Sequence, residues 1–212
     1  TSVYVNASSS DSGNVSTFID FDGSLVSWWR MDDYNSTNVH DYTGRNNGTI
    51  VGDASYTVSG KMGGAFEFDG TNDYIDIEDN DILSFTDELD NDKPFSISLW
   101  FNASSMRSSY NWIFAKRAAS SSLREYQIFL GAYQLKATLY DDSEGSAIGN
   151  SYLTALNTNQ WYHLIVTYNG NEAAEGLNIY LDGADMPNDY TTSGDYYGME
   201  NTGGEVQIGT NW

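Results

Sequence analysis

The residues with the most potential for chemistry lie between Phe66 and Glu78, in the stretch FEFDGTNDYIDIE. Its central loop places Asp69, Asn72 and Asp73 within five residues. Calcium in proteins takes about six to eight oxygen ligands from carboxylates, amides and backbone carbonyls, so this loop is a candidate Ca²⁺ site. In the alternative interpretation, Asp69 and Gly70 make an ordinary turn that Asn72 caps. The sequence leaves both interpretations open.

The strand that follows carries acids at alternating positions, Asp76 and Glu78. Every second side chain of a strand points to the same face, so these two carboxylates would lie about 6.5 to 7 Å apart. A retaining glycosidase pair is closer, at roughly 5 to 5.5 Å, and an inverting pair must flank the sugar from opposite sides. With no cysteine, two histidines and no serine in a nucleophile-type turn, a hydrolytic triad has no support. We therefore predict that the protein is not an enzyme.

Charge and composition restrict the partners. The chain has 9 Lys and Arg against 30 Asp and Glu, a net charge of −21. Such a charge repels nucleic acid and anionic membrane surfaces, so we expect neither as a partner. No run of apolar residues is long enough to insert into a membrane. With 40% hydrophobic and 15% aromatic residues, the 212-residue chain can bury one large core.

The pattern along the chain is that of an all-β protein. Alternating or apolar strand segments are separated by turn dipeptides such as Asp22-Gly23, Asn47-Gly48 and Asp182-Gly183. Residues 126–140 are predicted to form a hairpin that turns near Gly131, and a helix longer than one turn has little support. Many strands at short spacing favour a two-sheet antiparallel jelly-roll sandwich. We assign residues 20–212 to this domain and residues 1–19 to an extended linker or exchange strand.

Several stretches together resemble the laminin G-like domains of the concanavalin A-like lectin/glucanase superfamily, in the pentraxin-like branch of prokaryotic surface proteins. The resemblance covers about residues 20–212. The stretches that carry it are SLVSWWRMDD (24–33), residues 41–77, FSISLWF (95–101), QWYHLIVTYNG (160–170), LNIYLDG (177–183) and GGEVQIGTN (203–211). The resemblance implies a jelly-roll sandwich that serves as a non-catalytic binding or adhesion module.

The resemblance also bears on individual residues. Related sandwich glucanases carry their nucleophilic acid where this chain has Tyr74, which again predicts a protein without catalysis. In pentraxins an Asp-Asn pair binds calcium at the place of Asn72-Asp73, where the order is reversed here. Further pentraxin ligands follow the strand resembling residues 206–209, where this chain offers Asn211 as a candidate ligand and the acidic residues of the family pattern are missing or lie past Trp212. The family also has a further strand after the segment resembling residues 207–212. We expect it beside Leu25–Met31, either in a longer chain or supplied by a neighbouring subunit.

Two further kinds of candidate site are an aromatic surface that could bind a ligand and asparagines that could carry N-linked glycans. Trp100 alternates with Ile97, Leu99 and Phe101 in the strand, which places its flat ring on the open face if the aliphatic side chains form core. A loop that covers Trp100 is the alternative. Candidate N-glycosylation sites are Asn6, Asn14, Asn35, Asn47 and Asn102.

From these residues we predict an extracellular, cell-surface binding or adhesion module for a glycan or a surface protein, with Ca²⁺ as its candidate cofactor. The alternative is a structural subunit of an extracellular filament, in which copies of the chain are linked by exchange of the N-terminal strand.

Overall fold

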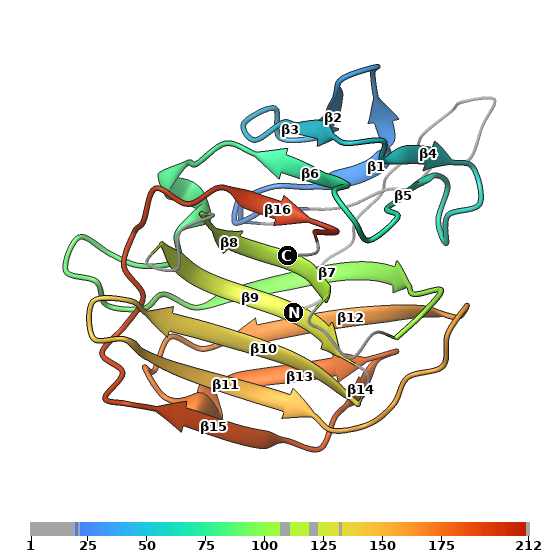
Figure 1. Cartoon of the computed structure of the whole chain (residues 1–212). Coiled ribbons are helices and arrows are strands. Elements are labelled where there is room, and N and C mark those ends of the chain that lie inside the picture. The colour runs from blue at the N-terminus through green and yellow to red at the C-terminus, as the bar shows by residue number, and fades with distance from the viewer. Residues whose placement is uncertain (1–19, 21, 107–110, 119–122, 132, 211–212) are drawn as a thin grey trace, which may run out of the picture.

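The computed structural model describes residues 20, 22–106, 111–118, 123–131 and 133–210. Within them the chain forms two large antiparallel sheets and a small two-stranded one (Figure 1). The strands of the ten-stranded sheet, in spatial order, are β1 (Trp29–Tyr34), β2 (Asn38–Asp41), β3 (Gly48–Val51), β6 (Tyr74–Ile77), β16 (Val206–Ile208), β8 (Asn111–Arg117), β9 (Arg124–Gly131), β10 (Gln134–Asp141), β11 (Ser146–Tyr152) and β15 (Asp189–Ser193).

The smaller elements complete the sandwich. The strands of the four-stranded sheet, in order, are β14 (Ala184–Asp185), β13 (Leu177–Leu181), β12 (Trp161–Tyr168) and β7 (Phe95–Asn102). The remaining pair is β4 (Ser55–Thr57) with β5 (Ala65–Glu67), and two short 3₁₀ helices are η1 (Asp81–Leu83) and η2 (Ala174–Gly176). Among the described residues, no helix is long and apolar enough to cross a membrane. The predicted jelly-roll sandwich is confirmed.

The sequence periodicity explains why these strands form. In β7 and β12 every second residue is more buried than its neighbours, as expected for strands with one face on the core and one toward solvent. In β9, seven of the eight residues are buried, because both faces of that central strand are covered. The predicted hairpin is also found: β9 and β10 pair with Gly131 opposite Gln134.

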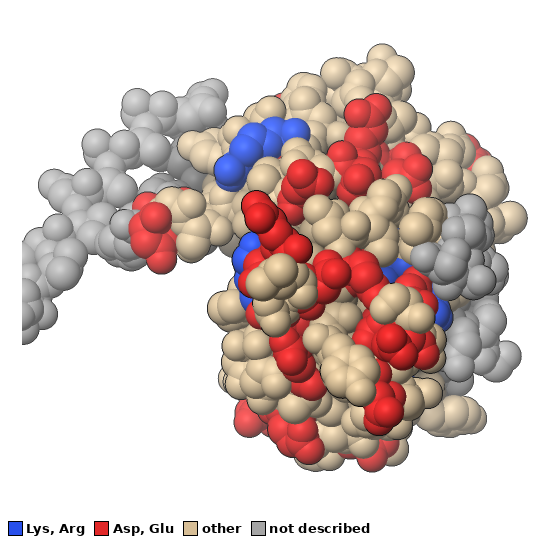
Figure 2. All heavy atoms as spheres, turned by 90° about the vertical axis from the view of Figure 1, so that its left-hand side faces the viewer, with Lys and Arg blue, Asp and Glu red and all other residues tan. Residues whose placement is uncertain are grey.

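Acidic side chains dominate one end of the sandwich. Figure 2 views the molecule from the left-hand side of Figure 1, where many Asp and Glu side chains and few Lys or Arg are exposed. This distribution fits the net charge of −21 and keeps polyanions away from that end.

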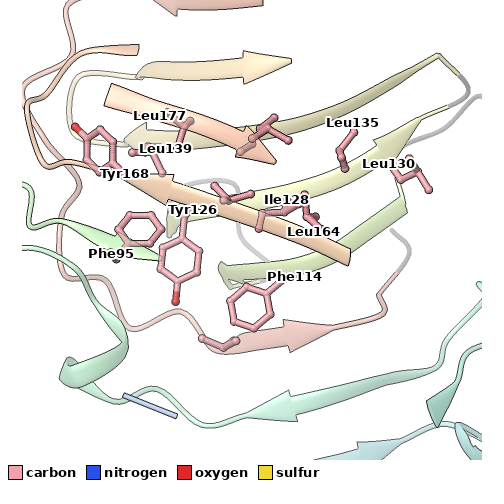
Figure 3. Packing of buried hydrophobic residues seen from close by; sticks show 14 of the residues in the cluster. Phe95, Phe114, Tyr126, Ile128, Leu130, Leu135, Leu139, Leu164, Tyr168 and Leu177 are labelled. Atoms are coloured by element: carbon pink, nitrogen blue, oxygen red, sulfur yellow. The ribbon is translucent and has the colours of Figure 1, made fainter. Parts of the chain in front are cut away.

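The core lies between the two large sheets. Leu164 and Leu177 of the smaller sheet are fully buried, as are Ile75 and Leu135 of the larger one. Aromatic rings fill one region of this core, and Tyr126 lies parallel to Phe114 with ring centroids 6.1 Å apart (Figure 3). Side chains on the opposite face of the ten-stranded sheet do not belong to this hydrophobic core, so they can form a binding surface.

Two predictions about chain ends stay predictions. Residues 1–19, assigned to the linker or exchange strand, lie outside the described residues. Within the described part of the chain, β1 is an edge strand that pairs only with β2, and the place of the expected additional strand is not tested.

Candidate functional site

Three carboxylates from two loops meet at the ends of β3 and β6. One oxygen from each of Asp53, Asp69 and Asp73 lies within 4.8 Å of the others. Asp73 is buried, and its two oxygens accept the backbone N–H groups of Asp53 at 2.9 Å and Asp69 at 3.0 Å. Gly52 makes room for this arrangement, because a Cβ at that position would lie 2.5 Å from Asp73 Oδ1. Asp73 therefore ties the two loops together.

The three charges perturb one another. Burial acts to raise the pKa of Asp73, but hydrogen bonds from the N–H groups of Asp69 and Asp53 outweigh it and hold that pKa below its usual value. The pKa of Asp53 is raised, first by its side-chain hydrogen bond to Asp73 and then by the charges of Asp73 and Asp69. A cation bound between the carboxylates would relieve this repulsion, and oxygen donors are the ligands that calcium prefers.

The structure brings together only some of the residues predicted from sequence. Asp69 and Asp73 lie in the cluster, and Asn72 is an exposed residue of the same loop whose backbone oxygen lies beside Gly52. Asn211 lies outside the described residues.

Asp53 was missed in the sequence. The pairing of Val51 with Tyr74 in the antiparallel β3–β6 ladder places residues 52–53 opposite residues 72–73. A correct prediction of this strand pairing from the sequence would have placed Asp53 beside Asp73.

Trp100 stands on the outer face of the four-stranded sheet, as the alternation predicts. It is 37% exposed, and its strand neighbours Ser98 and Asn102 are not part of the core. Its ring stacks on His163 at 4.8 Å between centroids, and the Lys61 ammonium lies 5.0 Å from the ring centre. The role of Trp100 in ligand binding stays a prediction.

A second surface emerges only from the register of the ten-stranded sheet. Adjacent strands place one residue each in a continuous row on the face that turns away from the core. In order from β6 to β15, the row is Asp76, Gln207, Ala115, Gln127, Thr138, Gly149 and Thr191. We call it the polar row. Side chains that are far apart in sequence thus form one line across the strands.

The polar row contains side-chain groups that lack partners within the described residues. Gln127, Thr138 and Gln207 are only 3%, 6% and 4% exposed, yet Gln127 Nε2, Thr138 Oγ1 and Gln207 Oε1 have no hydrogen-bond partner there. Gln127 Oε1, in contrast, accepts from Trp112 Nε1 at 3.1 Å and from the Tyr140 hydroxyl at 3.0 Å. Buried polar groups are normally paired, so three unsatisfied atoms on one row are unusual.

Of the two acids considered for catalysis, only Asp76 belongs to the polar row, at its β6 end. Asp76 is half-buried, its pKa is raised by burial, and it accepts a 3.3 Å hydrogen bond from Gln207 Nε2. Burial also raises the pKa of Tyr74, which disfavours the phenolate that a tyrosine nucleophile would need. Glu78 lies past the end of β6 and is exposed.

The candidate glycosylation sites divide by position. Asn35, Asn47 and Asn102 are exposed, whereas Asn6 and Asn14 lie outside the described residues. Glycosylation of any of them stays a prediction.

A separate hollow of about 310 Å³ lies beside η2. Its lining includes Ile148, Thr192 and Tyr197, together with the acidic residues Glu172 and Glu175. None of the residues of the acidic cluster or the polar row lines it.

The fold places the chain in the class of two-sheet antiparallel β-sandwich proteins. The family model of the concanavalin A-like lectin/glucanases superfamily matches residues 69–212, and the chain belongs to this superfamily. No curated protein sequence gave a match.

Solved structures show the same fold. The binding domain of Paraclostridial Mosquitocidal Protein 1 is 14% identical with a TM-score of 0.56, over 85% of this chain and 48% of that one. The botulinum neurotoxin type G receptor binding domain is 14% identical with a TM-score of 0.55, over 81% and 40%. A structure of botulinum neurotoxin type C, whose cell entry depends upon interaction with two ganglioside molecules, is 17% identical with a TM-score of 0.50, over 85% and 44%. This chain spans less than half the length of each, and at these identities the likeness shows the fold alone.

Proposed function

We propose that the protein is a non-catalytic, extracellular binding module that holds a glycan on the polar row of its ten-stranded sheet. The observation that carries this proposal is the set of unpartnered atoms on Gln127, Thr138 and Gln207, which have no partner within the described part of the chain. An amide N–H donates, an amide oxygen accepts, and a hydroxyl does both, so together they complement the hydroxyl groups of a saccharide.

The neighbouring rings suit the same ligand. Trp112 and Tyr140 are half-buried beside the polar row, and both donate to Gln127. Aromatic rings next to hydrogen-bonding groups are typical of sugar sites, because the ring packs against the C–H face of the sugar. The unpartnered atoms have almost no contact with water, so binding requires neighbouring side chains to move, and the proposal takes Trp112 and Tyr140 as those side chains.

The comparisons support a binding role in general terms. Two of the similar structures are receptor-binding or binding domains, and the third belongs to a neurotoxin whose cell entry depends upon gangliosides. For this chain we propose a neutral glycan, because its charge of −21 disfavours polyanionic ones. Calcium in the acidic cluster of Asp53, Asp69 and Asp73 would stabilise the two loops beside the sheet. The filament alternative rests on residues 1–19 and stays a prediction.

The test measures how strongly the wild type, Thr138→Val and Gln207→Leu are retained on an array of neutral and acidic glycans. Thr138→Val removes an unpartnered polar atom without removing volume, so this variant should fold at least as stably as the wild type. Gln207→Leu also removes the 3.3 Å hydrogen bond from Gln207 Nε2 to Asp76, so its folding is checked by urea unfolding before its binding is compared. We expect binding to fall about tenfold or more in each, which corresponds to about 1.4 kcal/mol. Thr167→Val, on the other sheet, is the matched control and should bind normally. Full binding by both variants would overturn the polar row as the site.

Trp100 is the second candidate surface. Loss of binding in Trp100→Ala, with normal binding in Thr138→Val, would move the site to the four-stranded sheet. Turnover of any glycan in the array by the purified wild type would instead show an enzyme.

A further inference from the structure

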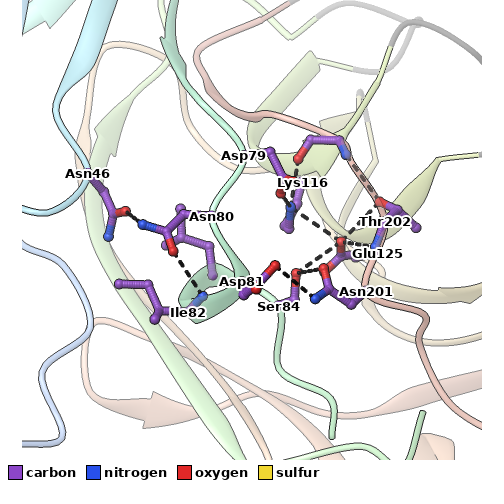
Figure 4. Close-up of polar contacts among 12 residues, drawn as sticks. Asn46, Asp79, Asn80, Asp81, Ile82, Ser84, Lys116, Glu125, Asn201 and Thr202 are labelled. Carbon is purple, nitrogen blue, oxygen red and sulfur yellow. Dashed lines mark hydrogen bonds and ion pairs between the residues drawn. The ribbon is translucent and has the colours of Figure 1, made fainter. Parts of the chain in front are cut away.

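A wholly buried lysine faces two carboxylates near the ends of β6, β8 and β9. Lys116 is 0% exposed, and its Nζ lies 2.5 Å from Asp79 Oδ1 and 3.3 Å from Glu125 Oε1 (Figure 4). Nζ also donates to the backbone oxygen of Gly204 at 2.6 Å.

Glu125 is held beside this contact in an environment that disfavours its charge. It is fully buried, and its Oε1 accepts from the backbone N–H of Thr202 at 2.8 Å and from the Ser84 hydroxyl at 3.2 Å. Its Oε2 has no partner among the described residues. Burial raises the pKa of Glu125, and the charge of Lys116 only partly offsets this. A carboxyl group whose pKa is raised in this way can both accept and return a proton.

We propose that Lys116 and Asp79 condense into an intramolecular amide bond, with Glu125 as the proton relay. Nothing in this proposal depends on the polar row or on glycan binding. It assigns a covalent function to a cluster of buried Lys116, buried Glu125 and partly exposed Asp79 that the binding role leaves unexplained.

The step balances without any other reactant. Transfer of one proton from Nζ to the Asp79 carboxylate converts the ammonium of Lys116 and the carboxylate of Asp79 into a neutral amine and a neutral acid. The amine lone pair attacks Cγ of Asp79 and forms the C–N bond. Glu125 accepts a proton from the nitrogen and returns it to the leaving hydroxyl, and the C–O bond breaks. One water is released, and the ion pair becomes an amide.

The surroundings favour this product. Burying the ammonium of Lys116 carries a desolvation penalty, which a neutral amide avoids. The fold holds amine and carboxyl in contact, which supplies the high effective concentration of an intramolecular reaction. Asp79 is 35% exposed on its side chain, so the released water has a way out. After condensation the one remaining N–H of Lys116 still donates to Gly204.

The amide would join parts of the sheet that are not neighbours. Asp79 follows β6 and Lys116 lies in β8, and β16 is inserted between these strands. The two residues are 37 positions apart in sequence. The bond would therefore link the two strands that flank β16, and residues 79–116 could not be stretched apart by force without breaking it.

Intact-mass spectrometry of the full folded chain tests the proposal. We expect the wild type to be lighter than its sequence by the mass of one water, with a linked peptide that contains Asp79 and Lys116. Lys116→Arg and Glu125→Gln should both show the full sequence mass, and the matched control Lys136→Arg should keep the loss.

Mapping of the linked peptide separates two sources of the same mass change. Dehydration at an Asp-Gly pair such as Asp69-Gly70 also removes one water, but it leaves Lys116 free for tryptic cleavage. A full-mass wild type, or a lost water that maps to such a pair, would overturn the proposal. Because the wild type alone decides this, a variant that fails to fold does not weaken the test.

Discussion

The carboxylate of Asp73 accepts the backbone N–H of Asp53 at 2.9 Å and thereby joins the turn after β3 to the loop before β6. Its other oxygen holds the N–H of Asp69. One buried side chain thus positions two exposed acids, and this gives Asp73 a structural role whether or not a cation is bound.

Replacing Asp73 should destabilise the protein even without calcium. Asp73→Ala removes two hydrogen bonds to a charged acceptor, and we expect a loss of about 2 kcal/mol in the free energy of unfolding, since water replaces part of each bond. Urea unfolding in the presence of a chelator measures it. Asn72→Ala, in the same loop, is the control and should change stability by less than about 0.5 kcal/mol. Equal stability of Asp73→Ala and wild type would contradict the role.

Calcium should raise the melting temperature of the wild type, and chelation should lower it again. At a calcium concentration of about 100 times the dissociation constant, the gain is about 2.7 kcal/mol. Asp53→Asn should abolish this response while leaving the metal-free protein folded, because Asp53 is exposed. Asp185→Asn, at an exposed position in β14, should respond as the wild type does. A wild type indifferent to calcium would rule out the cluster as a cation site.

Asp41 should contribute to loss of stability in acid. Burial acts to raise its pKa, but hydrogen bonds from Thr43 and from the backbone N–H groups of Trp28 and Asn46 outweigh this and lower it. A group whose pKa is depressed by folding stabilises the protein above its unfolded pKa of about 3.9, and that stability is lost as the pH falls through the lower folded value. Thermal unfolding between neutral pH and about pH 2 should show the loss, and Asp41→Asn should be less stable at neutral pH with a flatter acid limb.

Asp92 should act in the opposite direction. Its pKa is raised by burial, although it accepts hydrogen bonds from the Tyr168 and Tyr196 hydroxyls at 2.8 and 2.7 Å and from the N–H of Met199. The stability linked to its protonation is present below its unfolded pKa and falls as the pH rises through the higher folded value. In Asp92→Asn that fall should disappear from the plot of melting temperature against pH above the unfolded pKa of about 3.9. A slope identical to that of the wild type would show that Asp92 does not titrate in this range.

Local patterns were sufficient to predict the individual strands. The alternation in residues 95–101 and 161–168 predicted β7 and β12, because one face of each strand meets the core and the other meets water. The Asp69-Asp73 pair was also visible, since both residues lie on one short loop. Asp53 was not, because its proximity depends on the pairing of β3 with β6, two strands separated by the β4–β5 hairpin.

By itself, the sequence determined that this is an acidic, cysteine-free chain with alternating strand segments and with Asp69 and Asp73 on one short loop. These properties reside in composition and in neighbouring residues, so no long-range contact is needed to see them. The family resemblance added the sandwich fold and the expectation that Tyr74 stands where a sandwich glucanase has its acid. The tertiary structure alone decided that Gln207, Gln127 and Thr138 share one row and that Lys116 faces Asp79 and Glu125. The physical reason is strand register: a shift of one residue in any ladder would turn these side chains to the other face of the sheet, and register is fixed by the packed core as a whole.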